Sequence, residues 1–304
     1  MTIDYWDAER LRAALPPEKA VAALRERLET DPPSVERSAR YRRDTAFGQL
    51  LIMPDESSRH VGVKLISSSP GNRDLGLPLV QGTYVLMDSA TGTPIAVMDA
   101  AELTMVRTSC VAMLAVSCLS PAAAPRVAII GSGPQAVAHA EAARVLGASH
   151  VHAVVRSDAA AVRARALAAS RGLELDVAGP EVLASSDVIV CATSSPVPVL
   201  DDADVAEHAV VAAIGAHEAH TRELPTSLMG RASVYVETRR SALADSGNVL
   251  IAERELGRHI ITGELAELVS GTVRVPSDRP RVFVSVGESW EDLAVASVLA
   301  GAHR

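Results

Sequence analysis

The chain has 304 residues, 48% apolar and 22% charged, which is enough to bury a large core in about two domains. Its net charge is -8 at pH 7, and aromatic residues make up only 3% of it. Phosphate backbones are held by clustered Lys and Arg and bases by aromatic rings, so the composition argues against a nucleic-acid partner. No apolar run approaches the roughly 18 residues of a membrane span, and the amino terminus is acidic where a secretory signal is basic and then apolar. We therefore expect a cytoplasmic protein with no membrane partner.

The first 120 residues predict a small α+β domain. Apolar residues at helical spacing over 7–28, interrupted by Pro16 and Pro17, predict two short helices. Extended segments follow over 46–99, separated by the turn-rich sequences SSPGNRDLG and DSATGT, which predicts an antiparallel sheet joined by hairpins. Helical spacing returns over 100–119 and ends at a Pro/Ala segment, which we take as the first domain boundary.

The remaining chain alternates between strands and helices. Apolar strands are expected at 126–131, 151–155, 187–192, 209–214 and 233–236. Such alternation predicts a parallel sheet covered by helices, a Rossmann-type doubly wound α/β domain. The last segment, 281–300, predicts a strand and a helix that crosses back to the first domain. We thus predict a substrate-binding and dimerisation domain over 1–122 and 288–304, and a dinucleotide-binding domain over 123–287.

A glycine turn follows the first strand of this second domain. Gly131, Gly133 and Ala136 form GxGxxA between a buried strand and a helix. The first glycine permits a tight turn, the second lets a pyrophosphate approach the backbone, and the small third residue allows close packing of helix and strand. A tight turn without a ligand is the alternative. The predicted cofactor-binding segment comprises Gly131, Ser132, Gly133, Pro134, Gln135 and Ala136.

The end of the second strand bears on the choice of dinucleotide. An NAD site has an acidic residue there for the ribose hydroxyl, but this chain has Arg156 and Ser157, which suit a 2'-phosphate better. Asp158 can still serve the ribose, and Arg156 can be a solvated surface residue. The sequence therefore favours NADP(H), with NAD(H) as the alternative.

Few other residues point to chemistry by themselves. Lys64 lies in the otherwise apolar strand VGVKLI, where a partly desolvated amine can act as an acid or base and a solvent-facing lysine is the alternative. His217 and His220 are three residues apart just after a strand, whereas an HExxH metal motif needs a spacing of four on a helix, so we expect no metal site. Cys110, Cys118 and Cys191 form no CxxC pair and are expected to be buried free thiols.

Longer stretches of the chain resemble a known family. The segments GVKLIS, DSATGTP, LTMVRTS, GSGPQA, ATSSPVPVL and GESWEDLA occur in the order found in the ornithine cyclodeaminase/μ-crystallin family, over essentially the whole chain. The resemblance implies a homodimer whose first domain supplies the dimer interface and the substrate site, with NAD(P)(H) on the second domain. It also adds Thr193 to the cofactor-binding set.

The resemblance assigns roles to several charged residues. Arg40, thirteen residues before the Met of a Met-Pro turn, and Arg107 of LTxxRT correspond to arginines that bind the substrate carboxylate, although Arg42 and Arg43 can be confused with Arg40. Lys64 corresponds to the lysine that contacts the reacting nitrogen as a substrate-binding and catalytic residue. Two guanidinium groups can bind one carboxylate, and an amine can donate or accept a proton, so these residue types suit the roles that the resemblance implies.

Two further positions are compared with the family pattern. Cyclodeaminases of this family have an Asp where this chain has His217, which argues against amine elimination. A histidine can still donate a proton, and a non-catalytic His217 is the alternative. Asp292 matches a family Asp near the substrate, and its neighbour Glu291 replaces a frequent Gln. A plain helix-start residue is the alternative for Asp292.

The function expected from these residues is an NAD(P)H-dependent reductase of a small, cyclic α-imino acid, or in reverse an amino-acid dehydrogenase. Lys64, His217 and Asp292 are the expected catalytic residues. An ornithine or lysine cyclodeaminase, which is a lyase, is one alternative. A cofactor-binding protein with little catalysis is the other.

Overall fold

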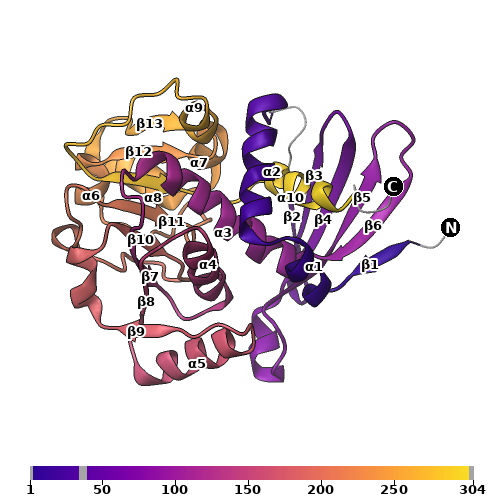
Figure 1. The fold of residues 1–304 in the computed structure, drawn as a ribbon, viewed down its shortest axis with the longest axis horizontal. Helices are drawn as coiled ribbons and strands as arrows, with labels where there is room; N and C mark the ends of the chain where they lie inside the picture. Colours follow the sequence, from indigo (N-terminus) through magenta and orange to yellow (C-terminus); the bar gives the residue numbers. More distant parts are fainter. Residues whose placement is uncertain (1–2, 34–39, 301–304) are drawn as a thin grey trace. The chain divides into compact units, whose positions relative to one another are not determined.

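A computed structural model describes residues 3–33 and 40–300 (Figure 1). The chain divides into two compact units: a first unit of residues 1–108 and 288–304, and a second unit of residues 109–287. The carboxyl-terminal limit is the expected one, whereas the first limit falls inside helix α3 (Ala100–Leu119) rather than in the Pro/Ala segment after it. The prolines end the helix, but its residues from Ser109 onward, about three turns, already belong to the second unit.

A six-stranded sheet organises the first unit. Its strands are β1 (Asp4–Trp6), β2 (Tyr41–Thr45), β3 (Gly48–Glu56), β4 (His60–Ser68), β5 (Val80–Asp88) and β6 (Pro94–Asp99), in the order β1-β6-β5-β4-β3-β2. β1 pairs with β6 in parallel, and the other pairs are antiparallel. The predicted hairpins are confirmed, whereas the two edge strands β1 and β2 were not predicted because neither carries a run of alternating apolar residues. Met53 and Pro54 lie within β3, so the expected Met-Pro turn is wrong.

Three helices accompany this sheet. The two predicted amino-terminal helices are α1 (Ala8–Ala14), capped by the Asp7 side chain, and α2 (Pro17–Thr30), which starts with a proline at its first position. The carboxyl-terminal helix α10 (Ser289–Ala300) contacts α2 and strands β3 to β5 (Figure 1). The carboxyl-terminal segment thus groups with the first unit.

Helix α3 connects the two units along the chain. It is long and apolar enough to cross a membrane by composition, contrary to the sequence expectation that no such run exists. However, 78% of this stretch is buried within the protein, as in the core helix of a globular fold.

The second unit contains an eight-stranded parallel sheet in the order β13-β12-β14-β11-β10-β7-β8-β9. The strands are β7 (Arg126–Ile130), β8 (His150–Val154), β9 (Asp176–Ala178), β10 (Val188–Cys191), β11 (Val210–Ala213), β12 (Ser233–Val236), β13 (Ile261–Glu264) and β14 (Arg281–Val284). The helices are α4 (Pro134–Val145), α5 (Asp158–Ala169), α6 (Thr226–Arg231), α7 (Arg239–Asp245), α8 (Gly247–Leu256) and α9 (Leu265–Val269). The doubly wound prediction is confirmed, and the central strands form the expected core of Val, Ile and Ala.

The strand order reverses beside β7. From β7 the chain continues outward to β8 and β9 and then returns to β10 on the other side of β7. Ligands of open α/β sheets bind outside the carboxyl ends of the strands at such a reversal. The fold therefore places the turns after β7 and β10 at the position where a dinucleotide binds.

Candidate active site

Four buried charged side chains meet in the first unit. The Nζ atom of Lys64 on β4 lies 2.7 Å from Asp292 Oδ2 on α10. Arg107 on α3 pairs through Nη1 with Glu291, and its Nε atom lies 3.3 Å from Asp292 Oδ1. All four side chains are 6% exposed or less. Buried charges persist only when they are paired, and here Asp292 is shared by both cations while Glu291 pairs with Arg107.

Strand alternation explains why Lys64 points inward. Along β4 the residues Gly62, Lys64 and Ile66 are buried, while Leu65 between them is exposed. Lys64 is thus on the face that α10 covers, and the solvent-facing alternative is wrong. Both carboxylates come from the first turn of α10, where the positive end of the helix favours negative charge.

The environment of Lys64 changes its acidity. Burial lowers the pKa of its ammonium group from 10.5 to about 8, although the Asp292 carboxylate opposes the shift. Arg107 lowers this pKa further by charge repulsion. A Lys64 amine with this pKa can release and take up a proton near neutral pH.

Two neighbours of Lys64 were missed by sequence reasoning. Tyr84 on β5 pairs with Lys64 across the sheet and is almost fully buried, and burial next to Asp292 raises the pKa of its phenol well above 10. Thr104 Oγ1 lies 3.4 Å from Lys64 Nζ. Neither has a local signal: a Tyr in a strand and a Thr in a helix are ordinary residues, and only the pairing of distant segments brings them to the lysine.

Arg40 is the remaining expected substrate-binding residue of this unit. It is half-buried and directly precedes Tyr41, which pairs with Ile52 on β3. The next residue of β3, Met53, pairs with Lys64. Arg40 therefore lies at the sheet edge, near the row that contains Lys64, while Arg42 and Arg43 are exposed on β2.

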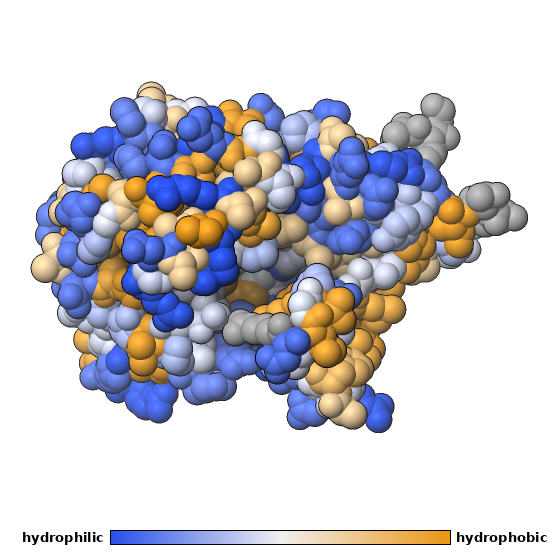
Figure 2. Space-filling view, turned by 90° about the horizontal axis from the view of Figure 1, so that it is seen from below, coloured by the Kyte–Doolittle hydropathy of each residue, from blue (hydrophilic) through white to orange (hydrophobic). Residues whose placement is uncertain are grey.

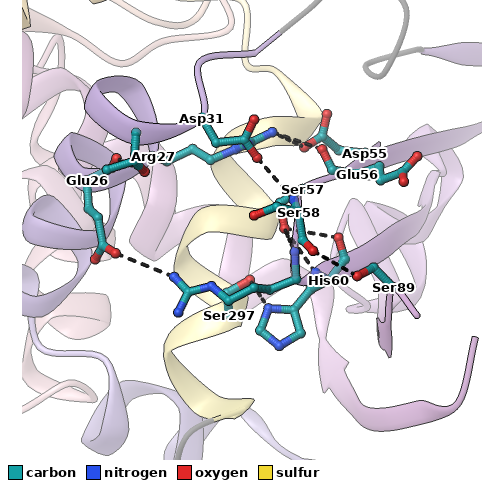
Figure 3. Close-up of polar contacts among 12 residues, drawn as sticks. Glu26, Arg27, Asp31, Asp55, Glu56, Ser57, Ser58, His60, Ser89 and Ser297 are labelled. Carbon is teal, nitrogen blue, oxygen red and sulfur yellow. Dashed lines mark hydrogen bonds and ion pairs between the residues drawn. The ribbon is translucent and has the colours of Figure 1, made fainter. Parts of the chain in front are cut away.

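A second buried pair fixes the strands beneath this cluster. Arg27 of α2 and Asp55 of β3 point toward each other, 3.3 Å apart, and Arg27 also donates to the Glu56 carbonyl (Figure 3). On the same hairpin, His60 Nδ1 lies 3.1 Å from Ser297 Oγ on α10 (Figure 3). These contacts hold α2 against β3 and α10 against β4, the strand that carries Lys64.

The glycine turn of the second unit has the shape that a dinucleotide requires. Gly131 has a φ of 146°, and a Cβ there would lie 2.5 Å from the Ala192 carbonyl oxygen and 3.3 Å from the Ala136 side chain. A Cβ on Gly133 would meet nothing within 4 Å, so the backbone beside it is open to a ligand. Helix α4 starts directly after Gly133 without a side-chain cap. Its free N–H groups can hold a phosphate, so these residues fit the expected cofactor.

The other expected cofactor residues have differing surroundings. Arg156 is exposed at the end of β8, where it can meet a phosphate, whereas the Ser157 hydroxyl caps α5 by accepting from Ala160 N. Thr193 follows β10, and both its N–H and its hydroxyl donate to the buried Glu223 carboxylate. Glu223 was not singled out in the sequence because an acidic residue in a loop is ordinarily solvated.

His217 lies in the second unit, in the loop after β11. It is exposed, and its Nδ1 atom is 3.0 Å from the Gly215 carbonyl oxygen. Within residues 3–33 and 40–300, no group of three His, Cys, Asp or Glu side chains is arranged to hold a metal ion. Cys110, Cys118 and Cys191 are free thiols, as expected, although Cys118 is only partly buried.

Comparison with known proteins identifies the family. Residues 14–302 match the model of the ornithine cyclodeaminase/mu-crystallin family. The chain belongs to this family. It is 36% identical over 229 residues to the NAD(P)H-dependent anabolic L-arginine dehydrogenase of Pseudomonas aeruginosa, covering 73% of this chain and 72% of the relative. It is 30% identical over 257 residues to the ketimine reductase mu-crystallin of Mus musculus, covering 83% of this chain and 80% of the relative.

A solved structure agrees with this membership. An archaeal alanine dehydrogenase dimer with bound NAD superposes with a TM-score of 0.85 at 26% identity, over 99% of this chain and 96% of that chain. The sequence resemblance is therefore confirmed, together with the Rossmann-type fold.

Proposed function

We propose that this protein is an NAD(P)H-dependent reductase that converts a small α-imino acid into an α-amino acid, and that it acts in reverse as an amino-acid dehydrogenase. The observation that carries this proposal is the buried cluster of Lys64, Arg107, Glu291 and Asp292 in a chain that also has the GxGxxA turn. Two relatives are named as an L-arginine dehydrogenase and a ketimine reductase, that is, as oxidoreductases of an α-amino acid and of a C=N bond.

The first unit supplies the groups that recognise such a substrate. Arg107 offers guanidinium N–H groups beside the Lys64 amine, so a carboxylate and the nitrogen on the adjacent carbon can be held together. Arg40 is the second carboxylate ligand. Lys64 exchanges a proton with the reacting nitrogen, since its lowered pKa lets it act near neutral pH. Asp292 keeps the ammonium form of Lys64 populated.

The second unit supplies the cofactor site. The open backbone at Gly133 and the start of α4 hold the pyrophosphate, with Ser132, Pro134 and Gln135 around it. A bound nicotinamide supplies the hydride that reduces the C=N bond. The exposed Arg156 pairs with a 2'-phosphate, so we propose a preference for NADP(H) over NAD(H).

His217 distinguishes the reductase hypothesis from the lyase hypothesis. An ammonia-lyase of this family needs a carboxylate at that place, whereas His217 is an exposed imidazole in the loop after β11. We propose that His217 assists proton transfer in reduction and that no amine is eliminated.

The test is a reduction assay with a panel of imino acids. NADPH is mixed with five- and six-membered cyclic α-imino acids, or with ammonia and 2-oxo acids that include one with a guanidinium side chain, and absorbance at the nicotinamide band is followed. We expect NADPH oxidation that Lys64→Met abolishes and that Lys19→Met leaves unchanged. Lys19, an exposed residue of α2, is the only other lysine in the sequence, which makes it the matched control. Release of ammonia from ornithine or lysine without net cofactor use would instead establish the lyase.

We also propose that the protein is a homodimer formed through the first unit's sheet. The face of the sheet that points away from α10 carries apolar side chains that are only partly covered, among them Ile52, Val63, Val85 and Val97, with Leu65 40% exposed. Figure 2 shows hydrophobic residues gathered over the first unit on the right-hand side of the view. A continuous apolar sheet face of this kind is typical of a protein interface.

Light scattering after gel filtration tests the dimer. Leu65→Asp places a charge in the middle of the sheet face and is expected to yield a monomer with the same circular dichroism spectrum. Val162→Asp on α5, where the side chain is 66% exposed, is the control and should stay dimeric. A wild-type monomer would contradict the proposal.

We also propose that the protein is located in the cytoplasm, where its three free thiols remain reduced.

A further inference from the structure

A buried carboxylate joins two loops at the cofactor edge of the second unit. Glu223 lies between β11 and α6 and is fully buried. Its Oε1 atom accepts hydrogen bonds from Thr193 N at 2.8 Å and from Thr193 Oγ1 at 2.7 Å. Its Oε2 atom accepts from Gly215 N at 2.7 Å. One carboxylate therefore holds Thr193 in the loop after β10 and Gly215 in the loop after β11.

The backbone of Glu223 is itself held by hydrogen bonds. The N–H groups of Glu223 and Leu224 both donate to Asn248 Oδ1, at 2.8 and 3.0 Å, and Asn248 is buried at the start of α8. The Glu223 carbonyl accepts from Val199 N at 2.9 Å. The carboxylate is thus anchored on a rigid segment, and it sets the position of the loops rather than following them.

These loops adjoin the glycine turn. Ala192, next to Thr193, has its carbonyl oxygen 2.5 Å from the place where a Cβ of Gly131 would lie. A Cβ on Gly215 would lie 1.9 Å from the Thr193 carbonyl oxygen and 2.6 Å from Glu223 Oε1. The turns after β7, β10 and β11 therefore form one tightly packed set at the reversal of the strand order. Displacing Thr193 or Gly215 would move the backbone that meets Gly131.

We propose that Glu223 is a positioning residue for cofactor binding: its ionised carboxylate holds the turns after β10 and β11 in the arrangement that receives the nicotinamide dinucleotide. This inference rests on the proposed function, since it concerns the same cofactor site. Glu223 acts through Thr193 and Gly215 and is not assigned a contact with the cofactor.

The donor set explains why the charge matters. Backbone N–H groups and a hydroxyl converge on the two carboxylate oxygens of Glu223. The ionised carboxylate can accept hydrogen bonds from all of them. A protonated carboxyl group would instead direct its own O–H toward these donors and lose one of the hydrogen bonds. Burial raises the pKa of Glu223 to about 7, and the hydrogen bonds from Thr193 and Gly215 limit this rise. The Glu223 carboxylate therefore loses its negative charge as the pH falls through about 7.

The other ionisable groups around this carboxylate are identifiable. Cys191 at the end of β10 is a neutral thiol, because burial and Glu223 raise its pKa well above 9. His217 and Glu218 follow Gly215 in the β11 loop, and Arg222 precedes Glu223 but pairs with Glu255 at 3.0 Å. His217 carries an ionisable imidazole on the same loop, so the pH series is repeated with His217→Gln to separate its contribution from that of Glu223.

The experiment measures cofactor binding by calorimetry from pH 5.5 to 8.5. NADH is used for the pH series, because the 2'-phosphate of NADPH titrates near pH 6 by itself. Wild-type protein should bind NADH with constant affinity above about pH 7.5 and lose about tenfold per pH unit below 7. Glu223→Gln should bind at least tenfold more weakly at pH 8 and show no such decline at lower pH. Glu218→Gln, a carboxylate of the same loop outside this hydrogen-bond set, should bind as the wild type does.

The possible outcomes distinguish a failure of the positioning role of Glu223 from a failure of the proposed function. Unchanged affinity and pH profile in Glu223→Gln would overturn the positioning role alone. A wild-type chain that binds neither NADH nor NADPH would overturn the cofactor assignment itself. If Glu223→Gln does not fold, Thr193→Val removes one donor to Glu223 with little change in volume. Its NADH affinity should fall at pH 8, and wild-type affinity would count against the proposal.

Discussion

The Lys64–Asp292 pair makes a quantitative prediction about the acidity of Lys64. With an effective dielectric constant of about 20, two unit charges 2.7 Å apart attract by about 6 kcal/mol, which is about four pKa units. The pKa of Lys64 is about 8 in the presence of this attraction, since burial outweighs it. Asp292→Asn removes the charge while it keeps the shape of the side chain. We therefore expect the pKa of Lys64 to fall well below 7, leaving a neutral amine at physiological pH.

Nuclear magnetic resonance can follow this shift directly. The sequence contains two lysines, Lys19 and Lys64, so protein labelled with ¹³C at lysine Cε gives two signals, and Lys19→Arg leaves only that of Lys64. The wild-type signal should titrate near pH 8, and that of Asp292→Asn several units lower. Glu291→Gln should lower the pKa by less, because Glu291 contributes less to the attraction.

Activity should follow the same titration. If the Lys64 ammonium donates the proton to the reacting nitrogen, kcat/KM for imine reduction declines in the wild type as pH rises through about 8. In Asp292→Asn the decline should begin at correspondingly lower pH. The reasoning is refuted if Lys64 titrates near 10.5 in the wild type, or if Asp292→Asn shifts its pKa by less than about one unit.

Four other changes have expected outcomes. Arg107→Lys removes the planar guanidinium that reaches both carboxylates of α10, so steady-state kinetics should show KM for the amino or imino acid raised about tenfold or more. Gly131→Ala, at a φ of 146° and in contact with backbone, should lower the free energy of unfolding by about 1 to 3 kcal/mol in urea titrations. A Cβ at position 133 would lie in open space, so Gly133→Ala should keep wild-type stability while it weakens cofactor binding. Equal free energies of unfolding for Gly131→Ala and Gly133→Ala would contradict this expectation. Glu223 stays protonated up to about pH 7 when folded and only to about 4.5 when unfolded, so it stabilises the fold at low pH and this contribution is lost as pH rises to 7. Relative to Glu223→Gln, wild-type stability should fall by about 3 kcal/mol over that interval, and parallel stability curves would argue against the buried charge.

Much of the fold could be predicted from local pattern. The change from alternating to helical spacing near residue 100, and the βα repeat after residue 126, identified both sheets because side-chain periodicity is written in consecutive residues. Short elements without a periodic signal escaped, among them β1, β2 and β9. β1 and β9 pair with strands that lie further away in the sequence, and β2 is an exposed edge strand that pairs only with β3, so the partner strand rather than the local pattern decides their conformation.

The sequence by itself singled out Lys64, Arg107 and the glycine turn as the candidates for the proposed chemistry, because few other functions require these residue types at these spacings. Only the tertiary structure decided what these residues contact. Arg107 and Glu291 are 184 residues apart in the chain, and the choice of Glu291 and Asp292 as partners follows from the packing of α10 on the sheet. The buried state of Glu223 likewise depends on the loops after β10 and β11 and on Asn248 of α8. Pairing and burial are properties of segments that meet in space, and these set the charges and pKa values on which the proposed reaction depends.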